Sequence, residues 1–256
     1  MLKLDVTRKT SEKSLTKYWK RSRGRNNQGR ITSRHRGGGK KLFRFVDLLQ
    51  REEKKSEVLT IESDPFRSSL IALVKDEDGG KRYILAPLGL SVGDKIIAAE
   101  GKVEIRPGNR MPLRYMPLGI EIHNLEMNLG KGGQLVRSAG TKASILAKEG
   151  EWANIQLPSG EVRRVHLNAK ASVGALTNAD RKNVSLGNAG RKRHMGWRPK
   201  NRGVAMNPND HPHGGGEGRS PIGMPGPKTP WGKPTLGYKT RKRKDVAGMI
   251  LTRRKG

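Results

Sequence analysis

Cysteine is absent from this 256-residue chain, and aromatic residues make up only 4% of it. Without a thiol the protein has no disulfide framework, no thiolate metal ligand and no cysteine nucleophile. So few aromatic side chains also argue against a row of rings that stacks single-stranded nucleic acid. The longest apolar runs, such as Leu70–Val74 and Ile96–Ala99, are far shorter than the roughly 20 residues of a membrane-spanning helix. The first residues lack the apolar segment of a secretory signal.

Acidic residues are scarce as well. The chain has 53 Lys and Arg against 23 Asp and Glu, which gives a formal net charge of +30. A folded protein with this charge would repel itself, so we expect a large anionic partner, of which nucleic acid is the usual one. An anionic membrane is less favoured, because the sequence has no basic amphipathic helix with a broad apolar face.

The positive charge is concentrated at the two ends of the chain. Residues 1–44 have 15 Lys and Arg against 2 acids, residues 45–185 have 21 against 18, and residues 186–256 have 17 against 3. The middle therefore reads as a near-neutral globular body, which we divide into domains at 45–108 and 109–185. The two ends are basic extensions with too few apolar residues for a core of their own, and we expect them to order only against a partner.

The middle of the chain is predicted to be mainly β. Its apolar clusters are short, β-branched and alternate with polar residues, and turn signals separate them at intervals of about 8–15 residues, as in small barrels and sandwiches. Pro158–Gly160 predicts a hairpin, and Asn178 predicts the N-cap of a short helical stretch. The expected strands lie at Val58–Ile61, Leu70–Val74, Tyr83–Ala86, Ile120–His123, Ser144–Ala147, Ala153–Leu157 and Val162–Leu167.

A first candidate binding segment, residues 23–41, mixes arginines, amides and glycines. Guanidinium groups bind phosphate oxygens in pairs, amides read base edges or 2′-hydroxyls, and glycines allow close backbone approach. A disordered basic tail is the alternative. A Walker loop is excluded, because Arg34 stands where its first glycine is required. The predicted RNA contacts are Arg23, Arg25, Asn26, Asn27, Arg30, Arg34, His35, Arg36, Lys40 and Lys41.

A second glycine-rich segment, residues 128–141, lies between apolar clusters of the middle region. It lacks the Gly-x-Gly-x-x-Gly pattern, so a dinucleotide fold is not indicated. Either it is a plain flexible hairpin loop, or its backbone amides and cations form a phosphate-binding surface. In the second case Lys131, Arg137 and Lys142 are the predicted RNA contacts.

The third segment, residues 207–218, has almost no apolar side chains and lies among cations. His211 and His213 with Glu217 admit a metal site, and Asp210, His211 and Ser220 admit a hydrolytic triad, but both are only sets of residue types without geometry. A histidine in an RNA-facing loop more often stacks or donates a hydrogen bond. The predicted RNA contacts here are Arg191, Lys192, Arg193, Arg198, Lys200, Arg202, Asn207, His211, His213, Arg219, Trp231, Arg241, Lys242 and Arg243.

Together these segments resemble the large-subunit ribosomal protein L2 family of the bacterial and organellar type. Besides Arg23 to Lys40, the motifs that carry the resemblance are Ser63-Asp64-Pro65-Phe66-Arg67-Ser68-Ser69, Arg82-Tyr83-Ile84-Leu85-Ala86-Pro87, His123-Asn124-Leu125-Glu126, Gly130-Lys131-Gly132-Gly133-Gln134-Leu135-Val136-Arg137-Ser138-Ala139-Gly140, Arg202-Gly203-Val204-Ala205-Met206-Asn207-Pro208, Asp210 to Arg219, and Thr229-Pro230-Trp231-Gly232.

The resemblance implies an OB-like barrel followed by an SH3-like barrel, with long irregular basic extensions. It implies a primary binder of large-subunit rRNA near the peptidyl-transferase region that supports subunit association and tRNA placement. Its partners would be rRNA and other ribosomal proteins, with a contact to small-subunit rRNA across the interface, and no membrane or small-molecule substrate. No cofactor is expected, and Mg²⁺ only as ions bound to the rRNA.

The resemblance also implies that the protein is not an enzyme. A chemical role has been suggested for the family's Asp-His loop, here Asp210-His211, but RNA can supply the chemistry while the loop only holds it in place. The rival hypothesis is a metal-dependent nucleic-acid-processing enzyme that uses His211, His213 and Glu217. The C-terminal basic extension holds only three acids, Asp210, Glu217 and Asp245, which are too few and too scattered for a two-metal site.

The sequence departs from the family pattern before Arg23, where the leader is short and does not match. It departs again at Gly39-Lys40, where the family usually has a histidine between the glycines and the lysine. A shortened, divergent sequence of bacterial type predicts an organellar ribosome, first a mitochondrial one and next a plastid or bacterial cytoplasmic one.

Overall fold

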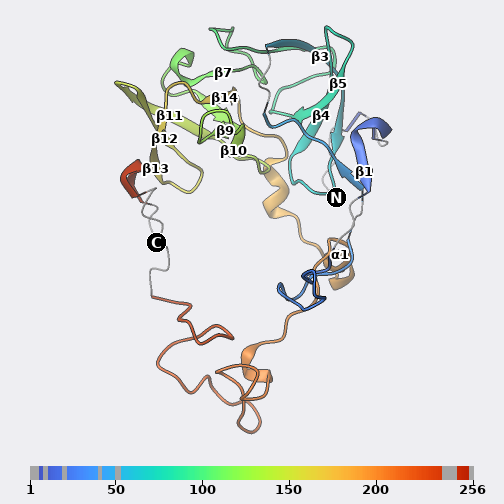
Figure 1. Ribbon diagram of the computed structural model, residues 1–256, viewed down its shortest axis with the longest axis vertical. Helices are drawn as coiled ribbons and strands as arrows, with labels where there is room; N and C mark the ends of the chain where they lie inside the picture. Colours follow the sequence, from blue (N-terminus) through green and yellow to red (C-terminus); the bar gives the residue numbers. More distant parts are fainter. Residues whose placement is uncertain are drawn as a thin grey trace. The chain divides into compact units, whose positions relative to one another are not determined.

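The computed structural model describes residues 6–7, 11–18, 22–39, 42–49, 53–237 and 247–253 (Figure 1). The predictions for Lys40, Lys41, Arg241, Lys242 and Arg243 lie outside these residues. The described chain forms two compact units, and each is considered by itself. We call residues 6–7, 11–18, 42–49, 53–187 and 247–253 the body, and residues 22–39 and 188–237 the basic unit.

The body is mainly β, as predicted. Eleven strands follow one another in a continuous sheet in the order β15-β13-β12-β11-β8-β14-β7-β6-β3-β4-β5, and two further pairs are β1–β2 and β9–β10. The strands are β1 Thr16–Tyr18, β2 Leu42–Arg44, β3 Lys54–Ser63, β4 Leu70–Asp76, β5 Lys81–Leu85, β6 Lys95–Ala98, β7 Arg110–Pro112, β8 Glu121–His123, β9 Leu125–Glu126, β10 Gly133–Leu135, β11 Ala143–Glu149, β12 Trp152–Gln156, β13 Val162–His166, β14 Lys170–Val173 and β15 Ile250–Thr252.

Helical structure is short among the described residues. The one α-helix is α1 Ala189–His194, in the basic unit. Among these residues no helix is long and apolar enough to cross a membrane. The 3₁₀ turns are η1 Lys13–Leu15, η2 Leu113–Tyr115, η3 Ala179–Asn183, η4 Gly203–Ala205 and η5 Ala247–Met249.

Strand β4 is the centre of the first half of the body. It pairs with β3 on one side and β5 on the other, and both of its faces are covered. Ala72 and Val74 pack into one apolar cluster, whereas Ile71 and Leu73 pack with Tyr83 into another. A strand buried on both faces has to be apolar at consecutive positions, which explains the unbroken run at Leu70–Val74.

The second half of the body has a separate core in which Met111, Ile122, Ile145 and Ile155 are fully buried. Strands β12 and β13 form the predicted hairpin: in its turn at Pro158–Gly160, the backbone N–H of Leu157 donates to Glu161 (2.9 Å) and that of Gly160 donates to Leu157 (2.9 Å). A parallel contact between β6 and β7 joins the two halves into one sheet.

The short helical stretch predicted after Asn178 is confirmed as η3, a 3₁₀ helix with Asn178 at its N-cap position. Asn178 has a left-handed backbone (φ 64°), and its side chain makes no cap bond. Its side-chain amide instead donates to the carbonyl oxygen of Ser68 at 2.7 Å. The residue therefore stabilises a long-range contact inside the body.

Each basic segment is flanked in the sequence by parts of the body. Strands β1 and β2, which flank the first segment, pair with each other in antiparallel fashion. The second segment follows residue 187 and precedes β15, which pairs with β13. The predicted domain boundaries at residues 44, 108 and 185 remain predictions.

Candidate nucleic-acid interface

The two basic segments pair with each other within the basic unit. Arg36 and Trp197 form an antiparallel β-bridge, and the backbone N–H of Arg198 donates to the carbonyl oxygen of His35 at 3.3 Å. The imidazole of His35 donates through Nδ1 to the carbonyl oxygen of Pro199 at 2.8 Å. Segments about 160 residues apart in the sequence thus form one site, whereas the charge pattern predicts two separate extensions.

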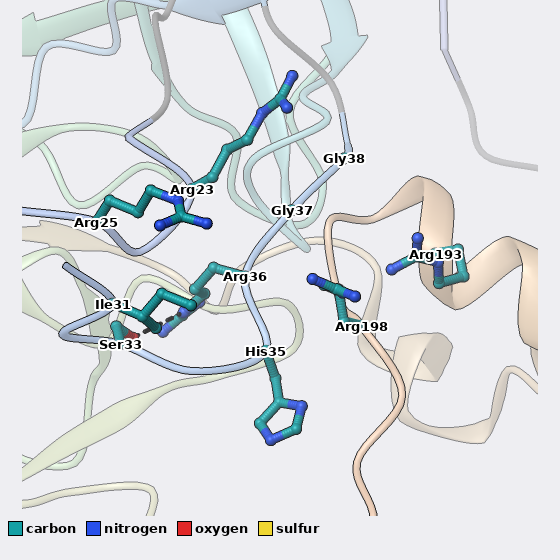
Figure 2. A pocket seen from close by; sticks show the side chains of 10 residues that line it. All are labelled: Arg23, Arg25, Ile31, Ser33, His35, Arg36, Gly37, Gly38, Arg193 and Arg198. Carbon is teal, nitrogen blue, oxygen red and sulfur yellow. Dashed lines mark hydrogen bonds between the residues drawn. The ribbon is translucent and has the colours of Figure 1, made fainter. Parts of the chain in front are cut away.

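Arginines of both segments line a pocket of about 330 Å³. Figure 2 shows Arg23 and Arg25 coming from the first segment and Arg193 and Arg198 from the second, with the backbone of Gly37 and Gly38 drawn between them. Arg36 belongs to the same lining, which contains no carboxylate. All five arginines are exposed, so their guanidinium groups can reach phosphate oxygens. Arg25 also donates from Nη1 to the carbonyl oxygen of Gly29 at 2.8 Å, and Arg36 from Nε to the Ser33 hydroxyl at 3.5 Å.

A tight loop presents Arg23, Arg25 and Arg36. Gly24 has φ +81°, and a Cβ there would lie 2.1 Å from the carbonyl oxygen of Ser33, so only glycine fits this crossing. The carboxamide oxygen of Asn26 accepts the backbone N–H of Arg30 at 2.9 Å, and that of Asn27 accepts the N–H of Gln28 at 3.1 Å. Both amides therefore stabilise the turn, and their predicted contacts with bases stay predictions.

Two cation–π contacts join the segments. The guanidinium carbon of Arg36 lies 5.0 Å from the ring centroid of Trp197, and that of Arg34 lies 5.8 Å from the ring of Trp231. Trp231 was a predicted RNA contact, and it remains 72% exposed. For Trp197 the sequence leaves two roles open, stacking on a base or holding the basic segment against the body, and the structure shows its ring against Arg36.

The two imidazoles of the Asp-His loop act as hydrogen-bond acceptors. His211 Nδ1 accepts the backbone N–H of His213 at 3.0 Å, and His213 Nε2 accepts the backbone N–H of Lys228 at 2.8 Å. Their ring centroids are 4.7 Å apart, and His211 is only 7% exposed. A ring nitrogen that accepts an N–H bond cannot at the same time bind a proton or a metal ion. The pair therefore shapes the loop.

The glycines of this loop serve its own packing. A Cβ on Gly203 would lie 2.5 Å from the His211 ring, and one on Gly214 would lie 2.2 Å from the carbonyl oxygen of Asn207. The structure does not assemble the hydrolytic triad, since the Ser220 hydroxyl donates to the backbone carbonyl oxygen of Glu217 at 3.0 Å. Within the described residues, no group of three or more His, Cys, Asp and Glu could hold a metal ion.

The glycine-rich segment 128–141 uses its backbone amides internally. The N–H of Gly132 donates to the Glu126 carboxylate (3.0 Å), and the N–H of Gly133 donates to the Leu48 carbonyl oxygen (2.8 Å). The amides of Gly132 and Gly133 are therefore engaged within the protein, and phosphate binding by the rest of the segment stays a prediction. Glycine is needed here for another reason: a Cβ on Gly132 would lie 2.5 Å from Leu49 Cδ2.

The remaining predicted contacts are distributed over both units. Lys131 is exposed, Arg137 is half-buried, and Lys142 forms an ion pair with Glu121. The exposed predicted contacts of the basic unit outside the arginine pocket and the loop histidines are Asn26, Asn27, Arg30, Arg34, Arg191, Lys192, Lys200, Arg202, Asn207, Arg219 and Trp231.

Comparison with protein-family models finds two matches. The model described as "Ribosomal Proteins L2, RNA binding N-terminal domain" matches residues 12–98. The model described as "Ribosomal Proteins L2, C-terminal domain" matches residues 106–232. The first match includes the basic segment 22–39, and the second includes α1 and the Asp-His loop.

Proposed function

Since this chain belongs to the ribosomal protein L2 family, and is thus an rRNA-binding structural constituent of the large ribosomal subunit, we propose that its basic unit is the principal grip on the rRNA. One observation carries this proposal. Five exposed arginines from two distant segments line one pocket that contains no carboxylate. Such a cluster repels itself until phosphate groups neutralise it.

The mechanism is electrostatic and structural. Each phosphate that a cation neutralises releases counterions, so rRNA affinity should fall steeply as salt rises. Neutralised strands can then approach each other closely. In our proposal this makes the protein a primary rRNA binder near the peptidyl-transferase region that supports subunit association and tRNA placement. Other ribosomal proteins and small-subunit rRNA across the interface are its further proposed partners.

The Asp-His loop has a positioning role in this proposal. Because His211 and His213 accept backbone N–H bonds, the loop is a preformed shape that RNA can pack against. The rival hypothesis of a metal-dependent enzyme acting through His211, His213 and Glu217 does not agree with the family, which is a structural ribosomal one.

We also propose that the ribosome concerned is organellar, and mitochondrial before plastid or bacterial. The support is the departure from the family pattern at Gly39-Lys40, where the family's usual histidine is missing. Sedimentation of the native protein with mitochondrial large subunits, compared with cytosolic ribosomes of the same cells, tests this proposal. Recovery only with the cytosolic ribosomes would contradict it.

The experiment that tests the grip compares two quadruple variants of equal charge. One changes Arg23, Arg25, Arg193 and Arg198 to Gln, and the other changes four exposed lysines of the body to Gln. Affinity for large-subunit rRNA is measured against salt concentration. If each arginine covers one phosphate, the slope of log K against log salt should become about 3–4 units less steep in the first variant. The control lysines are Lys55, Lys75, Lys95 and Lys102.

The control variant should keep nearly the full slope, because its lysines lie outside the proposed contact. An equal loss of slope in both variants would mean that only total charge matters. In that case the arginine pocket would not be the grip.

A further inference from the structure

The body has a pocket of different character. It encloses about 540 Å³, and its walls include Leu15, Phe45, Val46, Leu48 and Leu49. Phe45 is 48% exposed and Leu49 is 40% exposed. This volume lies within the usual range of ligand pockets, and exposed apolar side chains that gather around a hollow mark a binding surface.

The wall formed by residues 45–49 is fixed by bonds to both halves of the body. The backbone N–H of Asp47 donates to the carbonyl oxygen of Tyr83 at 2.7 Å. The carbonyl oxygen of Leu48 accepts the N–H of Gly133 at 2.8 Å. Because the segment is anchored on two sides, the pocket is preformed, and a ligand loses little affinity to ordering it.

One side of the pocket is an arginine whose three guanidinium nitrogens each donate a hydrogen bond. Arg82 donates from Nε to Asp76, from Nη1 to Asp47 and from Nη2 to the Ser56 hydroxyl, each at 3.0 Å. These acceptors hold the planar guanidinium in one orientation. An arginine held in this way can offer its flat face and its aliphatic stem to a ligand in the pocket.

The rest of the lining adds an amide and two more cations. Gln134 and Arg137 are half-buried, and Lys131 is exposed. Arg137 donates from Nη1 to the carbonyl oxygen of Gly133 at 3.3 Å, which holds it beside the pocket. An apolar hollow with an aromatic ring, a flat guanidinium, one carboxamide and adjacent cations has the features that recognise a nucleotide.

We propose that this pocket receives one unpaired base of the bound rRNA. The base stacks on Phe45 and on the flat face of Arg82, the carboxamide of Gln134 faces its polar edge, and Lys131 and Arg137 take the neighbouring phosphates. The cations favour a nucleotide over an apolar side chain of a neighbouring protein, which would gain nothing from them. The proposal rests on rRNA binding by this family and adds recognition of a base to the electrostatic grip.

The first test uses the full chain and methyl NMR. The probes are the four ribonucleoside 5′-monophosphates, and ribose 5-phosphate is the control that has the phosphate without the base. A stacked base should shift the methyl signals of Leu48 and Leu49 through its ring current, and ribose 5-phosphate should not. Equal shifts with both kinds of probe, or no methyl shift with any nucleotide at millimolar concentration, would overturn the proposal.

The second test measures affinity for large-subunit rRNA with Phe45→Ala, Phe45→Tyr and Tyr115→Ala. Tyr115 is a matched control, an aromatic residue of the body that is 39% exposed. Loss of stacking worth about 1–3 kcal/mol should weaken binding between about 5-fold and about 150-fold in Phe45→Ala. The salt slope should stay the same, because stacking releases no counterions. Phe45→Tyr and Tyr115→Ala should bind like the wild type.

The outcomes separate this proposal from the rRNA grip. If the wild-type chain does not bind rRNA, the grip itself fails. If it binds and Phe45→Ala binds equally well, only the base pocket is refuted. If Phe45→Ala binds free rRNA normally but is lost from reconstituted subunits, the occupant is a protein side chain and the base is excluded.

Discussion

Replacing Gly132 by alanine should destabilise the body far more than the same change at Gly130, in the same loop. Both glycines have φ +75°. A Cβ at position 132 would lie 2.5 Å from Leu49 Cδ2, 2.9 Å from Leu49 Cα and 3.0 Å from the Leu48 carbonyl oxygen, whereas position 130 has nothing within 4 Å. The pair of variants therefore separates backbone strain from steric contact.

The expected losses of stability follow from the cost of backbone strain and the cost of steric contact. A left-handed backbone costs an alanine about 1–2 kcal/mol at either position. At Gly132 the displaced Leu48–Leu49 segment adds about 1–3 kcal/mol of overpacking, part of it the lost bond from Gly133 N–H to Leu48. We expect Gly130→Ala to lower the free energy of unfolding by about 1–2 kcal/mol and Gly132→Ala by about 2–5 kcal/mol.

Urea unfolding followed by far-ultraviolet circular dichroism measures the difference, and thermal unfolding gives a second reading. Each 1 kcal/mol should lower Tm by about 2–4 °C in a body of this size. The reasoning is refuted if the two variants lose the same stability. Strain alone would then explain both, and residues 48–49 would not be fixed against the glycine loop.

Three further outcomes can be checked. His213→Ala removes the acceptor of the Lys228 N–H. Hydrogen exchange at that amide should then accelerate by at least about fivefold, the equivalent of about 1 kcal/mol. An unchanged exchange rate would contradict the hydrogen bond between these two residues. Burial lowers the pKa of His123 from 6.5 to about 4. As the pH falls, the unfolded chain therefore takes up this proton before the folded protein does. The contribution of His123 to the free energy of unfolding is complete above about pH 6.5 and should fall by up to about 3 kcal/mol toward pH 4. His123→Gln should flatten this part of the urea-midpoint profile, and an unaltered profile would rule His123 out as its cause. Trp197→Ala should weaken the pairing of the two basic segments by about 0.5–1 kcal/mol, the value of an exposed cation–π contact. A protease should then cleave the segment that contains Arg36 faster than in the wild type. Equal cleavage rates would contradict this prediction.

The β body could be predicted from the sequence because its signals are local. The run at Leu70–Val74 and the turn at Pro158–Gly160 carry their structure in neighbouring residues, and both predictions are confirmed. Family membership could also be predicted, from the glycine-rich and basic motifs.

The sites could be predicted only in part, since they depend on residues far apart in the chain. The charge pattern predicts that Arg25 and Arg193 contact RNA. No local signal in the sequence shows that the two side chains line the same pocket. The Gly132-Gly133 pair was open to two interpretations, because the partner of its amides, Leu48, lies in another segment. The pocket at Phe45 has no local signal either, because its lining comes from segments far apart in the sequence.

The pairing of β15 with β13 sets an order of events during synthesis. Strand β15 is the last strand of the described chain to leave the translating ribosome, so one edge of β13 stays unpaired while residues 188–237 are being made. An unpaired edge can pair with the wrong strand. Arrival of Ile250–Thr252 covers that edge, so the final residues of the described chain complete the sheet.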